Sequence, residues 1–400
     1  MKIGILKEEK NPPDKRVPLS PIQCKYILDN FKNVQIFVKS SNIRCFSDDK
    51  YTEIGIFVKN DISNCDVLLG VKEVPKSSLI PNKMYFYFSH TIKKQEYNRD
   101  LLQKMIDLNI EMVDYESLTD SNNKRLLGFG RYAGIVGAYN GFLTYGLKSG
   151  KYNLKAAHKC EGRKEVDLEL ENIKLSNEKI ILTGKGRVSN GALEILTSVN
   201  IKEVSKEDFI SKIFTESVFC RLDTMDYNVR KDNSPSNKYD FYNNPKNYQS
   251  SFMKYAKHAD IFIAGHFFGV GSPYLFTRED ARSVDFNLKV VADISCDIDG
   301  PVASTIRPST IEIPIYGYNP VTESEDNFKT EGVISVMAVD NLPCELPKDA
   351  SEDFGKEFID KILPCLLGED SDKVIERATL CKDGDLTSEF EYLRDYLEGN

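Results

Sequence analysis

The segment Lys179–Leu196 restricts the fold more than any other part of this sequence. Its apolar start, Lys179–Thr183, runs into two glycines separated by one lysine, and apolar residues then recur at positions i, i+3 and i+4. A strand, a tight glycine turn and a helix in this order are the setting of a dinucleotide-binding unit. One glycine permits the turn, the next lets a pyrophosphate approach the backbone, and the helix N-terminus faces its charge. The cofactor residues predicted here are Gly184, Gly186, Arg187 and Val188.

This turn departs from the usual G-x-G-x-x-G pattern, because Ser189 holds the third glycine position and Gly191 follows two residues later. An ordinary turn between a strand and a helix is therefore the alternative interpretation. An acid that binds the adenosine ribose should end the next strand. The next convincing strand, Val218–Leu222, is followed by Asp223, which favours NAD. The neighbouring Arg221 could accept a 2′-phosphate, so NADP stays an alternative.

Strand and helix patterns alternate along most of the chain. Before residue 120, short apolar runs such as Met84–Phe88 alternate with helical periodicity such as that of Gln95–Leu108. The alternation resumes after an apolar helix, Ala133–Leu147, and continues through Val290–Ile294. Such alternation predicts parallel sheets with helices on both faces. The expected fold class is α/β, with two Rossmann-like, doubly wound parallel-sheet domains separated by a cleft.

Two segments call for separate predictions. Asp232–Ser251 is polar and rich in Asn, Pro, Ser and Tyr, so we predict a surface insertion there. Ser351–Leu367 is predicted to be a helix, with Ser351 as its N-cap and Gly368 as its stop.

Two strand ends carry side chains suited to proton transfer. Lys72 directly follows the apolar run Val67–Val71, and His90 comes just after Met84–Phe88. The carboxyl ends of parallel strands line the ligand crevice, so both side chains should face the same space. A lysine and a histidine that lie close together lower each other's pKa, which suits acid–base chemistry near neutral pH. The plain alternatives are a surface lysine and a strand-end histidine without a catalytic role.

Four further side chains are candidates for binding. Arg16 lies in a proline-rich loop and Arg125 precedes a glycine-containing segment. Arginine binds carboxylates through paired hydrogen bonds, so the two would suit a substrate with more than one carboxylate, although either could be an ordinary surface arginine. His266 follows an apolar strand and could line the cofactor site. Asp293 ends another strand and could contact the nicotinamide ribose or orient a substrate amine.

Composition narrows the classes of partner. A net charge of −8 argues against nucleic acid, because phosphate binding requires a basic face. No apolar run reaches the roughly 20 residues that a membrane helix needs, and the first residues lack the pattern of a signal peptide. Nine cysteines are scattered without a C-x-x-C pair, which predicts neither a disulfide framework nor a zinc site. We therefore expect a reduced, cytoplasmic chain without a metal.

Eight motifs occur in an order that is more specific than any one of them. They are the glycine turn and the segments Asp14–Leu19, Gly70–Glu73, Phe88–Lys93, Asp114–Glu116, Phe129–Gly134, Ala292–Asp297 and Val339–Pro343. Together they resemble the lysine-forming saccharopine dehydrogenases and the lysine–ketoglutarate reductase domain of bifunctional lysine-degrading enzymes. These families lie within the alanine dehydrogenase and transhydrogenase fold group. The likeness covers nearly the whole chain.

The resemblance implies an enzyme that interconverts saccharopine with L-lysine and 2-oxoglutarate by hydride transfer to an imine. It implies NAD as the cofactor, with NADP as an alternative, and Lys72 and His90 as the catalytic pair. The substrate-binding residues that it implies are Arg16, Arg125, Glu73, Glu116 and Lys93, of which Glu73 and Glu116 would tune the catalytic pair. The cofactor-binding residues are the four of the glycine turn with Asp223, His266 and Asp293.

The resemblance also implies the domain organisation. Residues 1–135 and 334–400 should form the substrate and catalytic domain, and residues 136–333 the dinucleotide-binding domain. The expected partners are small amino-acid and 2-oxo-acid substrates, with no nucleic acid and no membrane, and the chain should be a monomer or a small homo-oligomer. Two alternatives remain at this point: an alanine dehydrogenase-like amino-acid dehydrogenase, and a catalytically silent nucleotide-binding homologue.

Overall fold

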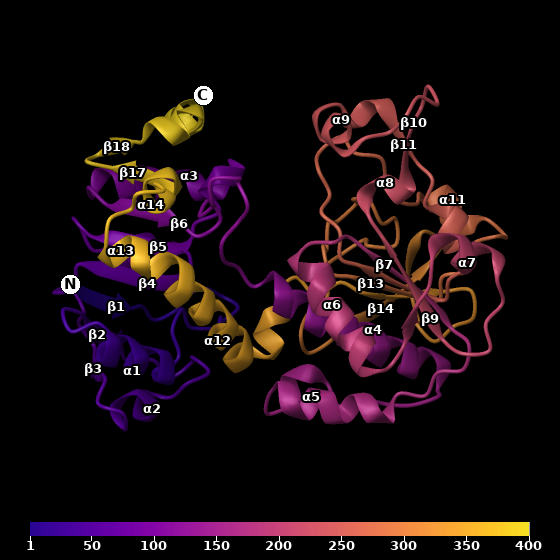
Figure 1. Cartoon of the computed structure of the whole chain (residues 1–400), viewed down its shortest axis with the longest axis horizontal. Helices are drawn as coiled ribbons and strands as arrows, with labels where there is room; N and C mark the ends of the chain where they lie inside the picture. The colour runs from indigo at the N-terminus through magenta and orange to yellow at the C-terminus, as the bar shows by residue number, and fades with distance from the viewer. Residues whose placement is uncertain (400) are drawn as a thin grey trace. The chain divides into compact units, whose positions relative to one another are not determined.

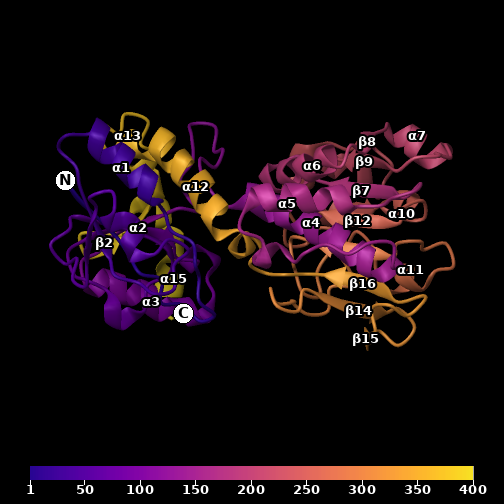
Figure 2. The ribbon, with the colours of Figure 1, turned by 90° about the horizontal axis from the view of Figure 1, so that it is seen from below.

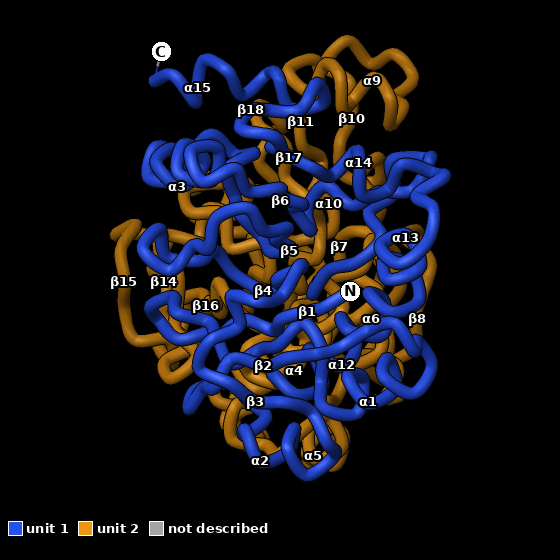
Figure 3. Tube along the Cα trace, turned by 90° about the vertical axis from the view of Figure 1, so that its left-hand side faces the viewer, with its two compact units in different colours: residues 1–129, 347–400 blue, residues 130–346 orange. Residues whose placement is uncertain are grey.

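The computed structural model describes residues 1–399, which divide into two compact units. Unit 1 contains residues 1–129 and the segment that begins at Pro347, whereas unit 2 contains Gly130–Leu346. Figure 1 follows the chain by colour, and Figure 3 shows the two units in blue and orange. Each unit is built on one eight-stranded sheet in which most neighbouring strands are parallel. The predicted α/β class with two Rossmann-like domains is confirmed.

The sheet of unit 1 is parallel across its six N-terminal strands. Its strands, in spatial order, are β18 (Asp385–Leu386), β17 (Thr379–Lys382), β6 (Glu111–Asp114), β5 (Met84–Phe88), β4 (Val67–Lys72), β1 (Lys2–Ile5), β2 (Gln35–Lys39) and β3 (Phe57–Lys59). Its helices are α1 (Pro21–Asn30), α2 (Asp48–Thr52), α3 (Glu96–Asp107), α12 (Pro347–Glu357), α13 (Leu363–Leu367), α14 (Val374–Ala378) and α15 (Arg394–Glu398). The chain adds β2 and β3 on one side of β1 and returns to add β4 on the other. The topological switch point therefore lies between β1 and β4.

Both faces of this sheet are covered by apolar clusters. Successive residues of a strand point to opposite faces, and β4 shows this directly. Its Leu69 and Val71 belong to one buried cluster and its Leu68 to the other. The strand is therefore an almost continuous apolar run, as a strand buried on both faces requires.

The C-terminal segment returns to the sheet that the N-terminal segment forms. Strand β17 pairs antiparallel with β6, and Figure 1 shows α12, α13 and α14 in yellow and orange beside the indigo and purple strands. From α12, Phe354 stacks on Phe129 with ring centroids 4.6 Å apart and packs edge-on against Tyr115 at 5.0 Å. The final residues therefore complete the core of unit 1.

The units divide at different residues from those predicted. The predicted return to the first domain at Ile334 is too early, because β16 (Ile334–Met337) pairs with two strands of the unit 2 sheet. The first boundary falls at Gly130 rather than at residue 136, because α4 (Gly130–Ser149) is one continuous helix of unit 2. The roles assigned to the two domains stay predictions.

The predicted N-cap at Ser351 is wrong. Helix α12 begins at Pro347, and Ser351 lies inside it, where its hydroxyl donates to Pro347 O at 2.6 Å and accepts from Val17 N at 2.9 Å. A serine within a helix commonly bonds back to the carbonyl four residues earlier. The helical path continues through a π-helical segment, Phe358–Ile362, and ends before Gly368 as predicted.

The sheet of unit 2 is parallel except at one edge, where β14 and β15 run antiparallel. In spatial order it contains β15 (Ser324–Asp326), β14 (Ile315–Asn319), β16, β13 (Val290–Asp293), β12 (Ile261–Ala264), β7 (Lys179–Thr183), β9 (Val218–Leu222) and β8 (Lys202–Glu203). Figure 2 shows most of these strand labels in this order along the sheet. Besides α4, the helices are α5 (Arg163–Glu169), α6 (Arg187–Ser198), α7 (Lys206–Ser211), α8 (Thr224–Tyr227), α9 (Lys238–Asn243), α10 (Met253–Ala256) and α11 (Arg278–Arg282). The switch point of this sheet lies between β7 and β12.

The predicted surface insertion has structure of its own. Strands β10 (Asn228–Arg230) and β11 (Tyr248–Ser250) form an antiparallel pair, and α9 lies between them in the chain. Within residues 1–399, no helix combines the length and the apolar character that crossing a bilayer requires.

Candidate active site

Lys72 and His90 follow adjacent parallel strands of unit 1. Lys72 ends β4 and pairs in register with Phe88, which ends β5, and His90 comes two residues later. Both side chains are half-buried, and both lie at the carboxyl ends of their strands, as predicted. The fold therefore brings the two predicted proton carriers to one edge of one sheet.

Glu73 connects this pair to the loop that follows β1. Its carboxylate accepts a hydrogen bond from Lys10 Nζ at 2.8 Å, and its Oε2 lies 3.4 Å from His90 Nδ1. Burial acts to raise the pKa of Glu73, but the contacts with His90 and Lys10 outweigh it and lower the pKa to about 2. Glu73 is therefore an anion beside the histidine at every physiological pH.

A second carboxylate, Glu116, lies between two cations at the end of β6. Its Oε1 is 3.7 Å from Lys93 Nζ and 3.8 Å from Arg125 Nη1. The Arg125 guanidinium also lies over the Phe88 ring, 5.5 Å from its centroid. Glu116 Oε2 is buried and accepts no hydrogen bond from the residues that the structure describes. An uncompensated buried carboxylate oxygen suits an incoming ammonium or hydroxyl donor.

Arg16 is held by its own loop. Its Nε and Nη2 donate to the two carboxylate oxygens of Asp14 at 3.0 and 2.6 Å, and its guanidinium lies 4.2 Å from the Phe129 ring centroid. Arg16 is 3% exposed. Its charge reaches Lys72, because burial first and Arg16 second lower the pKa of that lysine. The predicted substrate arginine thus also acts electrostatically on the predicted catalytic lysine.

Several supporting residues of this site were absent from the sequence predictions. Asp114 is fully buried and accepts from Ser89 N at 3.1 Å and from Glu116 N at 2.7 Å, so it ties the end of β5 to the end of β6. Lys10 and Asp14 hold Glu73 and Arg16 in the contacts described above. All three follow strands or lie in the loop after β1, so the strand-end rule applied to Lys72 could also have indicated them.

In unit 2, the glycine turn has the geometry that the fingerprint predicts. Gly184 has φ of +89°, and a Cβ there would lie 2.5 Å from Gly265 O. Only glycine fits both conditions. A Cβ on Gly186 would meet nothing within 4 Å, so the turn is open on the side that a phosphate would approach. Gly186 is the N-cap of α6, whose first residue is Arg187.

Ser189 and Gly191 have separate structural reasons to differ from the usual pattern. The Ser189 hydroxyl donates to Gly184 O at 2.7 Å and accepts from Arg221 Nε at 3.0 Å. These two hydrogen bonds stabilise the turn. Gly191 and Gly134 lie where α6 and α4 cross: a Cβ on Gly191 would lie 1.9 Å from Arg131 O, and one on Gly134 would lie 1.8 Å from Val188 O. The third glycine of this turn therefore serves helix–helix packing.

Asp223 follows β9 as predicted, but its carboxylate already has partners. It caps α8, accepts from Thr224 N at 2.8 Å and contacts Lys238 Nζ at 2.9 and 3.2 Å. Lys238 belongs to α9 of the insertion. Arg221 is turned toward the glycine turn, where it bonds Gly184 O, Ser189 and Asn190. Lys238 rather than Arg221 is therefore the cation that directly contacts Asp223, whose predicted role at the ribose stays a prediction.

His266 and Asp293 differ in whether their polar atoms already have hydrogen-bond partners within the protein. His266 Nδ1 bonds the Thr183 hydroxyl at 2.8 Å, whereas its buried Nε2 has no hydrogen-bond partner among residues 1–399. Burial lowers the pKa of His266 to about 4, so the ring is neutral. Asp293 is fully buried, and its oxygens accept from Thr305 Oγ1 at 2.6 Å and Ser295 Oγ at 2.7 Å. Asp293 thus braces its own loop, and its predicted contact with a cofactor stays a prediction.

These features of unit 2 fit a dinucleotide. The open face at Gly186, the N-terminus of the 12-residue helix α6 and the unbonded Nε2 of His266 all belong to the carboxyl ends of β7 and β12. These strands flank the switch point, where open α/β sheets bind their ligands. Among the described residues, no three His, Cys, Asp or Glu side chains gather as ligands of a metal would.

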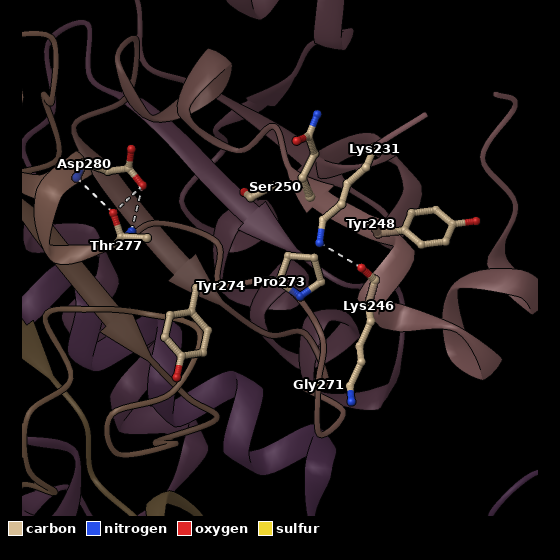
Figure 4. Close-up of a pocket in the computed structure, with 10 residues that line it drawn as sticks. Lys231, Lys246, Tyr248, Ser250, Gly271, Pro273, Tyr274, Thr277 and Asp280 are labelled. Carbon is tan, nitrogen blue, oxygen red and sulfur yellow. Dashed lines mark hydrogen bonds between the residues drawn. The ribbon is translucent and has the colours of Figure 1, made fainter. Parts of the chain in front are cut away.

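Two surface cavities lie away from these residues. One, of about 570 Å³, is bounded by the β10–β11 hairpin and the segment from Gly271 to Asp280 (Figure 4). In it, Lys231 Nζ donates to Lys246 O, and Asp280 is engaged by Thr277. A second, of about 570 Å³, lies in unit 1 near Cys365 and Lys382. Neither cavity is lined by a predicted site residue.

Fold and site define a two-unit α/β protein of the alanine dehydrogenase and transhydrogenase fold class. Residues 4–136 match the family described as alanine dehydrogenase/PNT, N-terminal domain. An L-alanine dehydrogenase structure superposes with a TM-score of 0.65 at 16% identity, covering 100% of this chain and 99% of that one. A transhydrogenase from Sinorhizobium meliloti superposes with a TM-score of 0.59 at 14% identity, covering 97% and 99%. At these identities the structures establish the fold alone.

The curated relatives are more specific. The alpha-aminoadipic semialdehyde synthase of Arabidopsis thaliana is 29% identical over 100% of this chain and 42% of its own length, and that of Mus musculus is 27% identical over 99% and 48%. The chain thus spans about half the length of these relatives. The saccharopine dehydrogenase [NAD(+), L-lysine-forming] of Schizosaccharomyces pombe is 26% identical over 90% of this chain and 91% of its own. The chain is therefore similar to both groups, and the resemblance drawn from the sequence motifs is confirmed.

Proposed function

We propose that this chain is a nicotinamide dinucleotide-dependent oxidoreductase that interconverts saccharopine with L-lysine and 2-oxoglutarate. The observation that carries the proposal is the row of charged side chains at the carboxyl ends of β4, β5 and β6, where Lys72 and His90 follow adjacent strands. The names of the relatives in both groups support the same reaction class. A sheet edge built only for structure would not need a half-buried lysine whose pKa burial and a neighbouring arginine lower.

The proposed chemistry divides the proton transfers between the two side chains. Lysine and 2-oxoglutarate condense through a carbinolamine to an imine, and this requires protons to move at the hydroxyl and at the amine. His90, oriented by Glu73, would exchange the proton of the hydroxyl. Lys72 would exchange the proton of the amine, and its lowered pKa favours that exchange nearer to neutral pH. The two groups therefore have separate roles in one condensation.

The substrate would be held through its carboxylates and its ammonium. Arg16, Arg125 and Lys93 supply cationic partners for a substrate with several carboxylates. The buried Glu116 Oε2, which lacks a hydrogen-bond partner among the described residues, would accept from the substrate amine. This combination favours the dicarboxylate 2-oxoglutarate, and saccharopine with its three carboxylates, over the single carboxylate of alanine.

The cofactor would be held by unit 2, through Gly184, Gly186, the N-terminus of α6, Asp223 and His266. When bound, the nicotinamide supplies or accepts the hydride at the imine carbon. Arg187 and Val188 would present the first amides of α6 to the pyrophosphate. Neutral His266, with Nε2 unbonded, could donate one hydrogen bond to the cofactor without adding charge.

The choice between NAD and NADP depends on Asp223 and Lys238 in this proposal. An aspartate alone at this position binds the ribose hydroxyls of NAD and repels a 2′-phosphate. Lys238 contacts both oxygens of Asp223 and offers a 2′-phosphate a compensating charge. We therefore propose that both cofactors are accepted.

The decisive experiment is steady-state oxidation of NADH and of NADPH with lysine plus 2-oxoglutarate, with each component omitted in turn. The proposal requires oxidation that depends on all three components and yields saccharopine. Oxidation with pyruvate and ammonia, and none with lysine and 2-oxoglutarate, would indicate an alanine dehydrogenase-like enzyme instead. Dinucleotide binding without turnover on either pair would favour the silent homologue.

A further inference from the structure

A buried glutamate that was not among the predicted site residues accepts a hydrogen bond from the backbone of Lys72. Glu8 belongs to the loop after β1 and is 6% exposed. Its Oε1 accepts from Val71 N at 2.7 Å, and its Oε2 accepts from Lys72 N at 2.9 Å. One carboxylate therefore binds two consecutive amides at the end of β4, the second of which belongs to the predicted catalytic lysine.

This contact occurs where the regular sheet ends. Strands β1 and β4 pair in register only as far as Ile5 and Leu69, and the register between β4 and β5 shifts between Leu69 and Lys72. Consecutive amides of a regular strand point to opposite sides, so both can face one carboxylate only if the strand is irregular there. Irregularities of this kind re-aim side chains next to active sites. Gly70 precedes the two amides, and a Cβ there would lie 3.1 Å from Leu6 Cδ1 and in ordinary contact, at 3.5 Å, with Glu8 Oε1.

The surroundings of Glu8 connect it to the rest of the site. Burial first and the Asp14 charge second raise the pKa of Glu8 to about 8, against the opposing effects of the two amides and of Arg16. The buried Tyr115 directly follows β6, and burial first and the Glu8 charge second raise its pKa; its hydroxyl has no hydrogen-bond partner among the described residues. Burying an ionisable group in such a place lowers the stability of the fold. A neutral residue of similar size would lower it less, so stability alone does not explain a glutamate here.

We infer that Glu8 is a positioning residue of the proposed active site, whose carboxyl group accepts from both amides at the irregular end of β4 and thereby sets the direction of the Lys72 side chain. The inference rests on the proposed function for its catalytic consequence. Its structural part, the control of Lys72 by Glu8, stands independently of which substrates the enzyme uses.

The test compares Glu8→Gln with Glu8→Asp and with Glu9→Gln. Glutamine keeps the size of Glu8 but offers one acceptor oxygen to two amides, so one amide is left without a partner. Aspartate keeps both acceptors on a shorter side chain. Glu9 is the matched control, since it is the exposed neighbour that bonds Ser78 and lies 3.9 Å from Lys39 Nζ. Thermal unfolding of each variant establishes that it is folded.

The first readout is turnover with lysine, 2-oxoglutarate and reduced dinucleotide. Glu8→Gln should lower kcat roughly 10- to 100-fold, the cost of misplacing a catalytic group by about 1 Å, while dinucleotide binding stays unchanged. Glu8→Asp should recover part of the loss, and Glu9→Gln should match the wild type. A Glu8→Gln enzyme that keeps the wild-type kcat overturns the inference, as does a loss of kcat that only follows a loss of folded protein.

The second readout does not depend on turnover. Acetylation of Lys72 by an amine-reactive reagent, followed by peptide mass spectrometry, is compared with acetylation of Lys76 in the same molecules. The ratio of Lys72 to Lys76 modification should change by about threefold or more in Glu8→Gln, which corresponds to half a pKa unit at the lysine. An unchanged ratio overturns the inference. If the wild type shows no turnover, the proposed function fails, and this ratio still decides whether Glu8 controls Lys72.

Discussion

The two units place different chemistry at the same edge of the same kind of sheet. In unit 1, the strand ends carry Lys72, His90 and the anion Glu73, and Glu73 Oε2 lies 3.4 Å from His90 Nδ1. In unit 2, the corresponding strand ends carry Gly184 and the neutral His266. Ionisable side chains, as in unit 1, suit proton transfer. An accessible backbone at a helix N-terminus, as in unit 2, suits dinucleotide binding.

The difference extends to how each site is stabilised. The charged groups of unit 1 are held by other charged groups, such as Asp14 on Arg16. The turn of unit 2 is held by hydrogen bonds to the backbone, such as that of Ser189 to Gly184 O, and by close helix packing. Changes in unit 1 should therefore alter rates and pH dependence, whereas changes in unit 2 should alter binding and stability. The predictions below test this division.

The largest effect is expected for Lys72→Met. Methionine fills similar space but carries no proton, so turnover should fall about a thousandfold, within the range that general acid–base groups contribute. Dinucleotide binding, measured by quenching of cofactor fluorescence, should stay within about twofold of the wild type. Lys76→Met is the matched control, because Lys76 is an exposed lysine of the same loop region that pairs with Asp100. Turnover that survives the change at Lys72 would remove the main distinction between the units.

The next effect concerns stability in unit 2. The pKa of His266 is lowered to about 4 in the folded chain. Between about pH 6.5 and pH 4, the unfolded chain therefore binds a proton that the folded chain does not bind. Stability from this source is present above that pH and is lost as the pH falls toward 4. Between pH 7 and pH 5, the free energy of unfolding of the wild type should fall about 2 kcal/mol further than that of His266→Asn. Urea titrations at both pH values measure this.

The same variant supplies the control for that titration. Above pH 7 the histidine is neutral in both states, so the wild type and His266→Asn should change in parallel between pH 7 and pH 9. Equal loss of stability in both proteins on the acid side would show that another group is responsible.

A third prediction concerns the open side of the glycine turn. Gly186→Ala adds a methyl group in empty space, so the unliganded protein should unfold at the wild-type temperature or slightly above it. The methyl group would lie where a pyrophosphate approaches the backbone, so dinucleotide affinity should fall about tenfold, or about 1.4 kcal/mol. Ser198→Ala at the other end of α6 should change neither. Unaltered affinity in Gly186→Ala would mean that the turn is an ordinary one.

Local pattern predicted the buried parallel strands well, and the edges poorly. Strands β5, β7 and β9 have the predicted bounds, because each is a short apolar run buried on both faces. The antiparallel strands β14 and β17 complete their sheets through pairing with distant segments, and no local signal marks such a partner. The early domain boundary at Ile334 has the same cause.

The positions of site candidates were predictable where one residue ends or follows one strand. Lys72, His90 and Asp223 could each be found in this way. Glu8 could not, because it stands in the charged run Lys7–Lys10, which has the pattern of a solvated loop, and its partners at Val71 and Lys72 lie more than 60 residues away. Lys238 is hidden in the same manner, since nothing in a polar insertion indicates a partner 15 residues earlier.

The smallest effect is expected where unit 2 does use a charge. Lys238 contacts Asp223 through Nζ at 2.9 Å, but both side chains are partly exposed, and exposed ion pairs contribute little. Lys238→Ala should therefore leave the unfolding temperature almost unchanged. Its effect should be on selectivity, because the free carboxylate then repels a 2′-phosphate without compensation. The affinity ratio of NADPH to NADH should fall about three- to tenfold, and added salt should reduce the difference by screening it. Lys231→Ala is the control, because Lys231 directly precedes the same insertion but bonds Lys246 O. If Lys238→Ala leaves the ratio unchanged, cofactor selectivity in unit 2 depends on backbone and shape alone. Unit 1 would then be the one that uses charged side chains and unit 2 the one that uses its backbone.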